Sequence, residues 1–468
     1  MLDIKRSTID RMRRVTLDMS FGARELLRRY RHGTLRPSEV IDAVLERINS
    51  GHIAHRAVWI SRVPESELRT RADQLAQLGP RPELALYGVP FAVKDNIDIA
   101  GLPTTAGCPA FAYDPDRHAG SVRRLLDAGA ILVGKTNLDQ FATGLTGTRS
   151  PYGACESVFG GDLVSGGSSS GSAVAVAAGL VSFSLGTDTA GSGRVPAALN
   201  GIVGLKPTRG LIGTSGVVPA CRSLDCVSTF TGDLADAATV LDVLAGPDPD
   251  DPWSRTAPPN SALNRLTAPH GLRLALATEG ELDFEGDLRM ADAYRRAEVR
   301  ATEQAEEIHR TPLGPLLEAG DLLYGGPWVA ERLTGLADFL AAHSDDVLPV
   351  TRAVIQRGAD YDAVSAFRGQ HRLQELRAWC AGLWDRADAL LLPTLPTTFT
   401  RAQIAEEPVS RNLVLGRYTQ FANLLDLAAV AIPAGWTADG RPVGISLLGP
   451  AFTEARLLRI AHQLRTSP

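Results

Sequence analysis

The first 80 residues carry apolar side chains at the three- and four-residue spacing of amphipathic helices. Two stretches show this spacing most clearly, RELLRRYRHG and SEVIDAVLERINS, and Ser38 with the charged residues after it is typical of a helix start. We therefore predict that residues 1–80 form helices that pack against a sheet.

From Leu86 onward the pattern changes to short apolar runs separated by glycine and proline, which is typical of strands. The runs predicted as strands or strand ends are YGVPFAVKDN, AILVGKTN, GLVSFSLGTD and GIVGLKPT. A helix-like segment from Ser121 to Ala128 lies among them. Strands that alternate with helices indicate an α/β layered core, whose richest part is predicted at residues 86–231.

The second half of the chain returns to helical patterns before it ends in further strands. Residues 246–260 are rich in Pro and Asp and are predicted as a surface connection, whereas 286–308 and 326–380 have the pattern of amphipathic helices. The later strand-like runs are ALLLPTLPT, NLLDLAAVAIPAG and RPVGISLLGP, and the chain ends in the helical pattern TEARLLRIAHQLRTSP. We expect this last part to complete the sheet.

Composition narrows the class of protein. With 468 residues, 44% hydrophobic and 22% charged, the chain resembles an ordinary globular protein and not a disordered, coiled-coil or collagenous one. A chain of this length buries a large core without disulfides or structural metals. The net charge of −5 supplies no basic field for nucleic acid or an anionic membrane, so we expect a small-molecule partner.

Two features predict a cytoplasmic setting. The five cysteines are an odd number, and the N-terminal stretch MLDIKRSTIDRMRRVTLDMS has charges where a signal peptide needs an apolar core. The longest weakly polar stretch, Ser172 to Gly186, is shorter than the ~20 residues that span a bilayer. We predict no transmembrane segment.

The basic residues are unevenly divided between arginine and lysine. Of the 48 basic residues only four are lysines, namely Lys5, Lys94, Lys135 and Lys206. Lysine, unlike arginine, loses its proton when it is desolvated. The three lysines between 94 and 206 are therefore either residual surface charges or chemically active groups.

Two apparent motifs do not fit their contexts. GAILVGKT at 129–136 matches the phosphate-binding P-loop, but its four central residues form an apolar strand and not a polar loop. GSSSG, centred on Ser169, matches the nucleophile elbow of α/β-hydrolases, but the strand that an elbow requires does not precede it. Neither function is favoured.

Two Gly/Ser-rich loops are better candidates for chemistry. SGGSSSGS at 165–172 leads directly into the apolar stretch AVAVAAG, which argues against a flexible linker and indicates a loop at a helix N-terminus. GTDTAGSGRVP at 186–196 is similar. A nucleophilic serine needs a base, and no histidine occurs between His118 and His270, so Lys94 and Lys135 are both candidates.

These segments together resemble the amidase signature family. The resemblance is carried by GVPFAVKDN, GGSSSGS, GTDTAGSGRVP and GLKPTRG, and Ser192 follows Ser168 by 24 positions, as in the family's motif. Ala190 and Ser170 depart from it, since glycine is common in the family at both positions. The resemblance implies an α/β fold in which a large mixed central sheet is flanked by helices on both faces.

The resemblance also implies a Ser-Ser-Lys triad. Ser192 would attack the amide carbonyl, Ser168, after a cis peptide bond, would relay its proton, and a buried neutral Lys94 would accept it. The backbone N–H groups of Thr189, Ala190, Gly191 and Ser192 would form the oxyanion hole. The alternative is that these serines only cap helices.

Within the family, the chain is most similar to the subfamily that hydrolyses allophanate, a urea bearing a carboxylate. The similar segments are DNIDIAGLPTTAGCPAFAY, TNLDQFATGLTGTRSPYG, VVPACRSLDCVS and YGGPWVAERL. Tyr324 and Arg332, predicted on similar sides of one helix, match the subfamily's substrate-binding pair, and Gly144 is a candidate for a backbone contact with substrate. On their pattern alone, Tyr324 and Arg332 fit an ordinary helix surface better.

The resemblance implies one amidase domain over 1–468. Its parts would be N-terminal helices at 1–80, the signature core at 86–231, a helical substrate-pocket region at 260–385 and a sheet-completing part at 386–468. Subfamily members commonly carry an additional C-terminal domain, which we expect to be absent here. No cofactor or metal is implied, because no Cys/His cluster has ligand spacing, and a homodimer is possible.

Three alternatives stay open at this point. The chain could be an amidase for another small amide, the amidase component of a tRNA-dependent amidotransferase, or a protein without catalytic activity. The complete set of Lys94, Ser168 and Ser192 disfavours the last of these.

Overall fold

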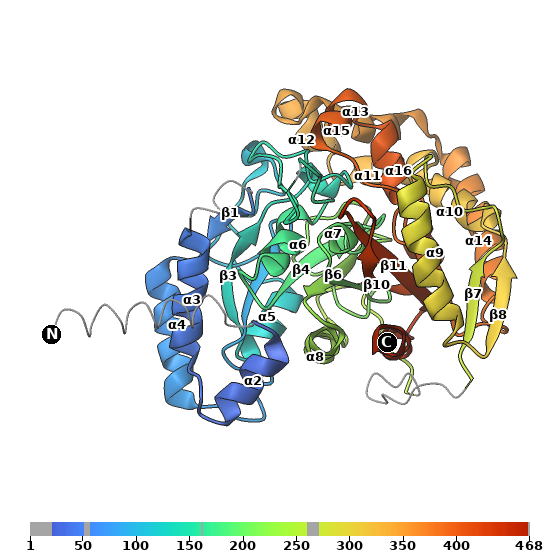
Figure 1. The fold of residues 1–468 in the computed structure, drawn as a ribbon. Coiled ribbons are helices and arrows are strands. Elements are labelled where there is room, and N and C mark those ends of the chain that lie inside the picture. Colours follow the sequence, from blue (N-terminus) through green and yellow to red (C-terminus); the bar gives the residue numbers. More distant parts are fainter. Residues whose placement is uncertain (1–20, 51–56, 161, 260–270, 467–468) are drawn as a thin grey trace.

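The computed structural model describes residues 21–50, 57–160, 162–259 and 271–466. Within these ranges one sheet of 11 strands crosses the molecule, in the order β1-β3-β2-β4-β6-β5-β10-β11-β9-β7-β8 (Figure 1). The strands are β1 (Trp59–Arg62), β2 (Pro90–Lys94), β3 (Ile131–Thr136), β4 (Phe183–Asp188), β5 (Val203–Lys206), β6 (Cys226–Thr231), β7 (Arg273–Ala277), β8 (Glu307–Thr311), β9 (Ala389–Pro393), β10 (Leu427–Trp436) and β11 (Pro442–Pro450).

The sheet is mixed. β2 runs parallel to both β3 and β4, β7 runs parallel to β8 and β9, and the pairs from β4 through β9 are antiparallel. β10 pairs with β5, so the strands of the C-terminal part continue the sheet begun by residues 86–231. The mixed sheet that the family resemblance implies is confirmed.

Helices cover both faces of the sheet. The first half of the chain contributes α2 (Ala23–Arg31), α3 (Pro37–Asn49), α4 (Glu65–Leu78), α5 (Gly120–Asp127), α6 (Ser170–Ala177), α7 (Val195–Leu199) and α8 (Leu234–Leu244). The second half contributes α9 (Leu288–Thr302), α10 (Gly314–Tyr324), α11 (Trp328–Thr334), α12 (Ala337–His343), α13 (Pro349–Gln356), α14 (Ala363–Ala381), α15 (Arg401–Glu406), α16 (Ser410–Gly416), α17 (Phe421–Leu424) and α18 (Glu454–Thr466).

Side-chain alternation along the strands decides which core each residue enters. On β2, Phe91 and Val93 pack with α5, α8 and α18, whereas Ala92 faces the opposite core with α3, α4 and α6. Toward the other end of the sheet, α10, α14 and α17 cover Leu390 and Leu392 of β9. Lys94, two residues after Ala92, therefore lies on the face that carries α6.

The structure contains strands that the sequence analysis did not predict. The region 260–385, predicted as helical, contributes β7 and β8 at the edge of the sheet, and 326–380 forms four separate helices, α11 to α14, with 3-10 turns between them. β8 has the sequence EIHRT and is largely exposed, so it lacks the apolar run by which strands were predicted. β1 and β6 were also missed, and Lys5 lies outside the described residues.

The Asp-rich stretch at 246–260 is more than a surface connection. Asp251 accepts hydrogen bonds from the backbone N–H and hydroxyl of Thr214, and Asp248 accepts one from Ser215 Oγ at 2.5 Å. Both carboxylates are buried. These bonds therefore tie the 246–260 stretch to the loop before β6, which is part of the signature core.

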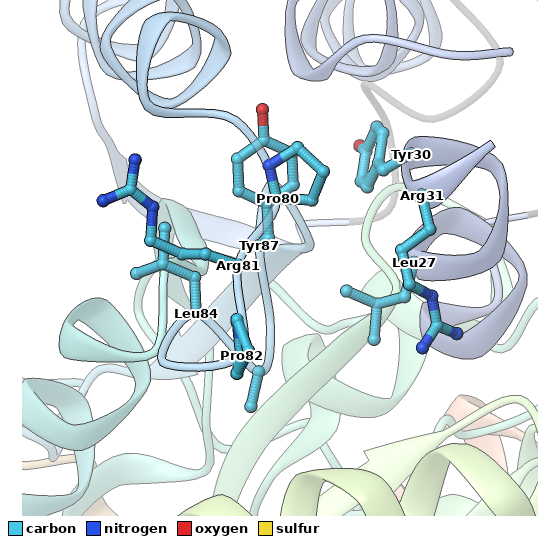
Figure 2. A pocket seen from close by; sticks show the side chains of 9 residues that line it. Leu27, Tyr30, Arg31, Pro80, Arg81, Pro82, Leu84 and Tyr87 are labelled. Atoms are coloured by element: carbon cyan, nitrogen blue, oxygen red, sulfur yellow. The ribbon is translucent and has the colours of Figure 1, made fainter. Parts of the chain in front are cut away.

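A hollow of about 420 Å³ lies between α2 and the turn that leads into β2 (Figure 2). Its lining is mainly apolar and consists of Leu27, Tyr30, Arg31, Pro80, Arg81, Pro82, Leu84, Ala85 and Tyr87. The rings of Tyr30 and Tyr87 meet edge to face at 5.4 Å. None of the residues predicted for catalysis or substrate binding lines it.

Among the helices in the described parts of the chain, none has the length and apolarity needed to cross a membrane.

Candidate active site

Lys94 is the last residue of β2 and has no exposed surface. Its Nζ lies 2.7 Å from Ser168 Oγ and 2.7 Å from Thr187 Oγ1. Burial lowers the pKa of Lys94 to about 7, although Asp139, Asp225 and Asp188 act in the opposite direction. At and above neutral pH a large fraction of this amine is therefore unprotonated and able to accept a proton.

Ser168 joins Lys94 to Ser192. It follows a cis peptide bond from Gly167, just before α6, and its Oγ lies 3.0 Å from Ser192 Oγ. A Cβ at Gly167 would stand 2.0 Å from a carboxylate oxygen of Asp139, so only glycine fits there. The structure thus brings Lys94, Ser168 and Ser192 into one hydrogen-bonded chain.

Ser192 lies in the turn after β4, which Asp188 and Arg194 hold together. Arg194 Nε and Nη2 each donate to Asp188 at 2.9 Å, and the N–H groups of Gly191 and Gly193 donate to the same carboxylate at 2.9 and 3.0 Å. Burial would raise the pKa of Asp188, but the ion pair with Arg194 outweighs it and the pKa is lowered. The carboxylate therefore stays ionised and fixes the turn.

These bonds correct one residue of the predicted oxyanion hole. The Gly191 N–H is used by Asp188, so it is not a free donor. In the described structure the N–H groups of Thr189, Ala190 and Ser192 make no hydrogen bond, and these three residues are buried. The set of candidate oxyanion donors is therefore reduced from four to three.

Asp225, which the sequence pattern did not single out, also stabilises the turn after β4. It accepts hydrogen bonds from the Thr189 hydroxyl and from the N–H groups of Ala220 and Cys221. Burial raises the pKa of Asp225 to about 6. No signal in the local sequence identifies it, because its partner Thr189 lies 36 residues away.

Tyr324 and Arg332 come together, but from two helices and not from one as predicted. Tyr324 ends α10, Arg332 lies within α11, and the segment Gly325 to Pro327 separates the helices. The guanidinium carbon of Arg332 stands 5.5 Å from the centre of the Tyr324 ring. Both side chains are buried, with 2% of Arg332 exposed, so they are not an ordinary helix surface.

The surroundings of Arg332 leave part of its guanidinium without a partner. Arg332 Nη1 donates to Thr143 Oγ1 at 2.7 Å and to the Ala142 carbonyl at 3.4 Å, whereas Nη2 is buried without a hydrogen bond. Its charge acts on Lys94, whose pKa it lowers. A buried guanidinium without a carboxylate partner among the described residues is suited to an anionic ligand.

Gly144 directly follows Thr143, so the structure places it beside the Arg332 contact. A Cβ at this position would stand 2.6 Å from Asp139 Oδ2 and 3.1 Å from Arg149 Cδ. Packing thus requires a residue without a side chain here.

The other lysines and serines considered in the sequence have different environments. Lys135 is buried in β3 and pairs with Asp95 at 2.9 Å, so its amine is already engaged and the P-loop interpretation is excluded. Lys206 is buried and donates to the Pro207 carbonyl at 2.7 Å. Ser169 Oγ bonds to the backbone of Thr187, which leaves it no role as the elbow nucleophile.

Comparison with known proteins identifies the family of this chain. The chain matches the Amidase family over residues 39–458. It is 43% identical over 436 residues to urea amidolyase of Lachancea kluyveri and 44% identical over 408 residues to that of Saccharomyces cerevisiae, covering 92% and 86% of this chain. It spans only 24% and 22% of the length of these two relatives.

Two further proteins illustrate the range of the similarity. The solved structure of Kluyveromyces lactis allophanate hydrolase superposes with a TM-score of 0.88 at 41% identity, covering 94% of this chain and 72% of that one. A glutamyl-tRNA(Gln) amidotransferase subunit from Natronomonas pharaonis is 36% identical over 82% of this chain and 97% of its own length. With the match covering most of its length, this chain belongs to the amidase family.

Proposed function

We propose that this chain hydrolyses the terminal amide of allophanate through an acyl-enzyme on Ser192. The observation that carries the choice of substrate is the buried Arg332 guanidinium, with an unpartnered Nη2 and a charge that acts on Lys94. Allophanate offers a carboxylate to this cation and an amide carbonyl to Ser192. The similarity to allophanate hydrolase and the urea amidolyases supports the same choice.

In the proposed first step, protons move along the hydrogen bonds from Ser192 through Ser168 to Lys94. Neutral Lys94 accepts the Ser168 proton, Ser168 Oγ accepts the Ser192 proton, and Ser192 Oγ attacks the amide carbonyl. Hydroxyl hydrogens rotate freely enough to adopt this order. The N–H groups of Thr189, Ala190 and Ser192 are the candidate donors to the resulting oxyanion.

The remaining steps complete the hydrolysis. The tetrahedral intermediate collapses by breaking the C–N bond. The leaving amine takes the proton held by Lys94, through Ser168, and departs as ammonia. Water then attacks the acyl carbon while Ser168 and Lys94 again remove its proton. The bond between the acyl carbon and Ser192 Oγ breaks, the acid departs, and the proton returns through Ser168 to Ser192 Oγ.

The stoichiometry gives a prediction about products. Cleavage of one terminal amide of allophanate yields one ammonia and N-carboxycarbamate. We expect rapid-quench NMR to detect both at the enzymatic rate, with a second ammonia only from slower spontaneous breakdown. Two ammonias at the enzymatic rate, without carboxycarbamate, would show that this chain completes the reaction alone.

The substrate proposal predicts a charge-selective effect of Arg332→Lys. A point charge replaces the planar, two-pronged donor, so kcat/KM for allophanate should fall by about 10- to 100-fold. The matched test pair is malonamate, which has CH₂ in place of the allophanate NH, and malonamide, which lacks the negative charge. Ammonia release should drop for malonamate and change little for malonamide.

Equal losses on the charged and neutral amides would mean that Arg332 is structural. Glutamine serves as a further control, because faster turnover of glutamine than of allophanate would favour the amidotransferase alternative. Purification of the chain alone before these assays separates its own activity from that of a partner.

We propose further that the protein works in the cytoplasm. Cys108, Cys221, Cys226 and Cys380 are buried and form no disulfide in the described part of the chain, which fits a reducing compartment. Three further points stay predictions from the resemblance: one amidase domain with four parts, the lack of a cofactor, and a homodimer.

A further inference from the structure

Thr143 lies between two buried guanidinium groups. Its Oγ1 accepts a hydrogen bond from Arg332 Nη1 at 2.7 Å, and its backbone carbonyl accepts one from Arg149 Nη1 at 3.0 Å. The exposed fractions of Arg332 and Arg149 are 2% and 4%. One threonine therefore contacts both buried guanidinium groups, including that of Arg332, the proposed partner of the substrate carboxylate.

The Thr143 hydroxyl has a fixed orientation. It donates to the Phe141 carbonyl at 3.1 Å, so its proton points away from Arg332 and a lone pair faces the guanidinium. The turn that allows this contact is tight, because Phe141 and Ala142 adopt φ values of 53° and 52°. Such left-handed conformations persist only where the surroundings hold them in place.

The Thr143 bond also decides which part of Arg332 stays free. The other acceptor for Nη1, the Ala142 carbonyl, is more distant at 3.4 Å. The Tyr324 ring makes a cation–π contact with the guanidinium and accepts no conventional hydrogen bond from it. With Nη1 held by the hydroxyl, the planar guanidinium keeps Nη2 unpartnered. Without the hydroxyl, the group could turn about its long side chain.

The loop that bears Thr143 is itself tied to the catalytic chain. Arg149 N–H donates to Asp139 Oδ1 at 2.8 Å, and Asp139 N–H donates to the Ser168 carbonyl at 3.0 Å. Arg149, which fixes the Thr143 carbonyl, is thus connected through Asp139 to the residue that joins Lys94 and Ser192. The position of Arg332 is set relative to the nucleophile through this loop.

We propose that Thr143 is a positioning residue that determines preference for anionic amides, by orienting the Arg332 guanidinium toward the substrate carboxylate. The inference rests on the proposed function of Arg332. It assigns Thr143 no contact with the reacting atoms.

The test uses the full chain with Thr143→Val, which keeps the shape but removes the hydroxyl, and Thr143→Ser, which keeps the hydroxyl. For malonamate we expect Thr143→Val to raise KM by about tenfold with kcat changed less than about threefold, because ground-state placement of the carboxylate is lost. KM for malonamide should stay unchanged. Thr143→Ser should restore most of the malonamate affinity.

A double-mutant cycle with Arg332→Gln separates positioning from packing. If Thr143 acts through Arg332, adding Thr143→Val to Arg332→Gln should change KM for malonamate by less than about twofold. Full additivity, an equal loss on malonamide, or wild-type KM in Thr143→Val would each overturn the inference. Thermal unfolding of every variant identifies losses that come only from misfolding.

The two proposals fail in different ways. If the wild-type chain has no preference for malonamate over malonamide, the proposed anionic substrate fails. If that preference exists and Arg332→Gln removes it, but Thr143→Val leaves it intact, only the role of Thr143 fails.

Discussion

Ser192→Ala is expected to lower amide hydrolysis by at least about 10³-fold while leaving the fold intact. The substitution removes the atom proposed to attack the carbonyl, and members of a catalytic chain that act as a unit show losses of this size. The substitution removes no charge, and Ser168 and Lys94 keep their mutual hydrogen bond, so the buried network stays largely in place. Ammonia release and thermal unfolding, measured on the same preparation, check both parts.

Lys94→Arg should cause a comparable loss, because arginine retains its proton and is no base at neutral pH. The matched control is Ser170→Ala, in the same Gly/Ser loop, whose Oγ makes only a 3.4 Å contact with the Asn137 carbonyl. It should retain activity. Wild-type rates in Lys94→Arg would refute the triad, and a covalent adduct mapped to Ser169 by mass spectrometry would restore the elbow interpretation.

The second large effect is on pH dependence, because the Lys94 amine must be unprotonated to act as a base. With the pKa of Lys94 at about 7, kcat/KM should rise with pH and level off above neutrality. At pH 5 about one amine in a hundred is neutral, so the rate should be about 100-fold below its plateau. Malonamide is a suitable substrate, because its charge does not change over this range. A flat profile between pH 5 and 8 would contradict the role of Lys94.

Stability provides an independent measure of the same pKa. Folding lowers the pKa of Lys94 from 10.5 to about 7, so between these values the unfolded chain binds more protons than the folded one. The contribution of Lys94 to the free energy of unfolding therefore increases as pH rises from 7 to 10.5. The stability advantage of Lys94→Met over wild type should shrink by about 4 kcal/mol across this range.

Urea unfolding of the two proteins at pH 7, 9 and 10.5 measures this difference. Comparison with Lys94→Met cancels the titration of the tyrosines and of the other lysines, which both proteins share. A constant difference across the range would mean that the buried amine has an ordinary pKa.

The amino-acid sequence by itself determined the elements whose signals are local. β2, β3, β4 and β5 are short apolar runs bounded by glycine or proline, and they form where predicted because such a run is recognisable as a buried strand from its own residues. The Gly/Ser loop before α6 was identified in the same way. The motifs also placed Lys94, Ser168 and Ser192 in one family pattern.

Other features depend on contacts between distant residues, which no local pattern records. β8 is polar and becomes a strand only because β7 offers it hydrogen-bond partners. Likewise, Tyr324 and Arg332 meet because α10 and α11 are separate helices whose side chains come into contact, whereas the sequence spacing suggested a single helix.

The choice of the base shows most clearly the difference between what local sequence indicates and what tertiary contacts decide. The residues alone left both Lys94 and Lys135 as candidates, since both follow apolar strand residues in the same α/β segment. The fold pairs Lys135 with the Asp95 carboxylate and leaves Lys94 with only hydroxyl partners, Ser168 and Thr187. Burial lowers the pKa of both amines, but Asp95 acts against this lowering at Lys135, and Lys94, unlike Lys135, contacts Ser168. The tertiary structure therefore favours Lys94 as the proposed base.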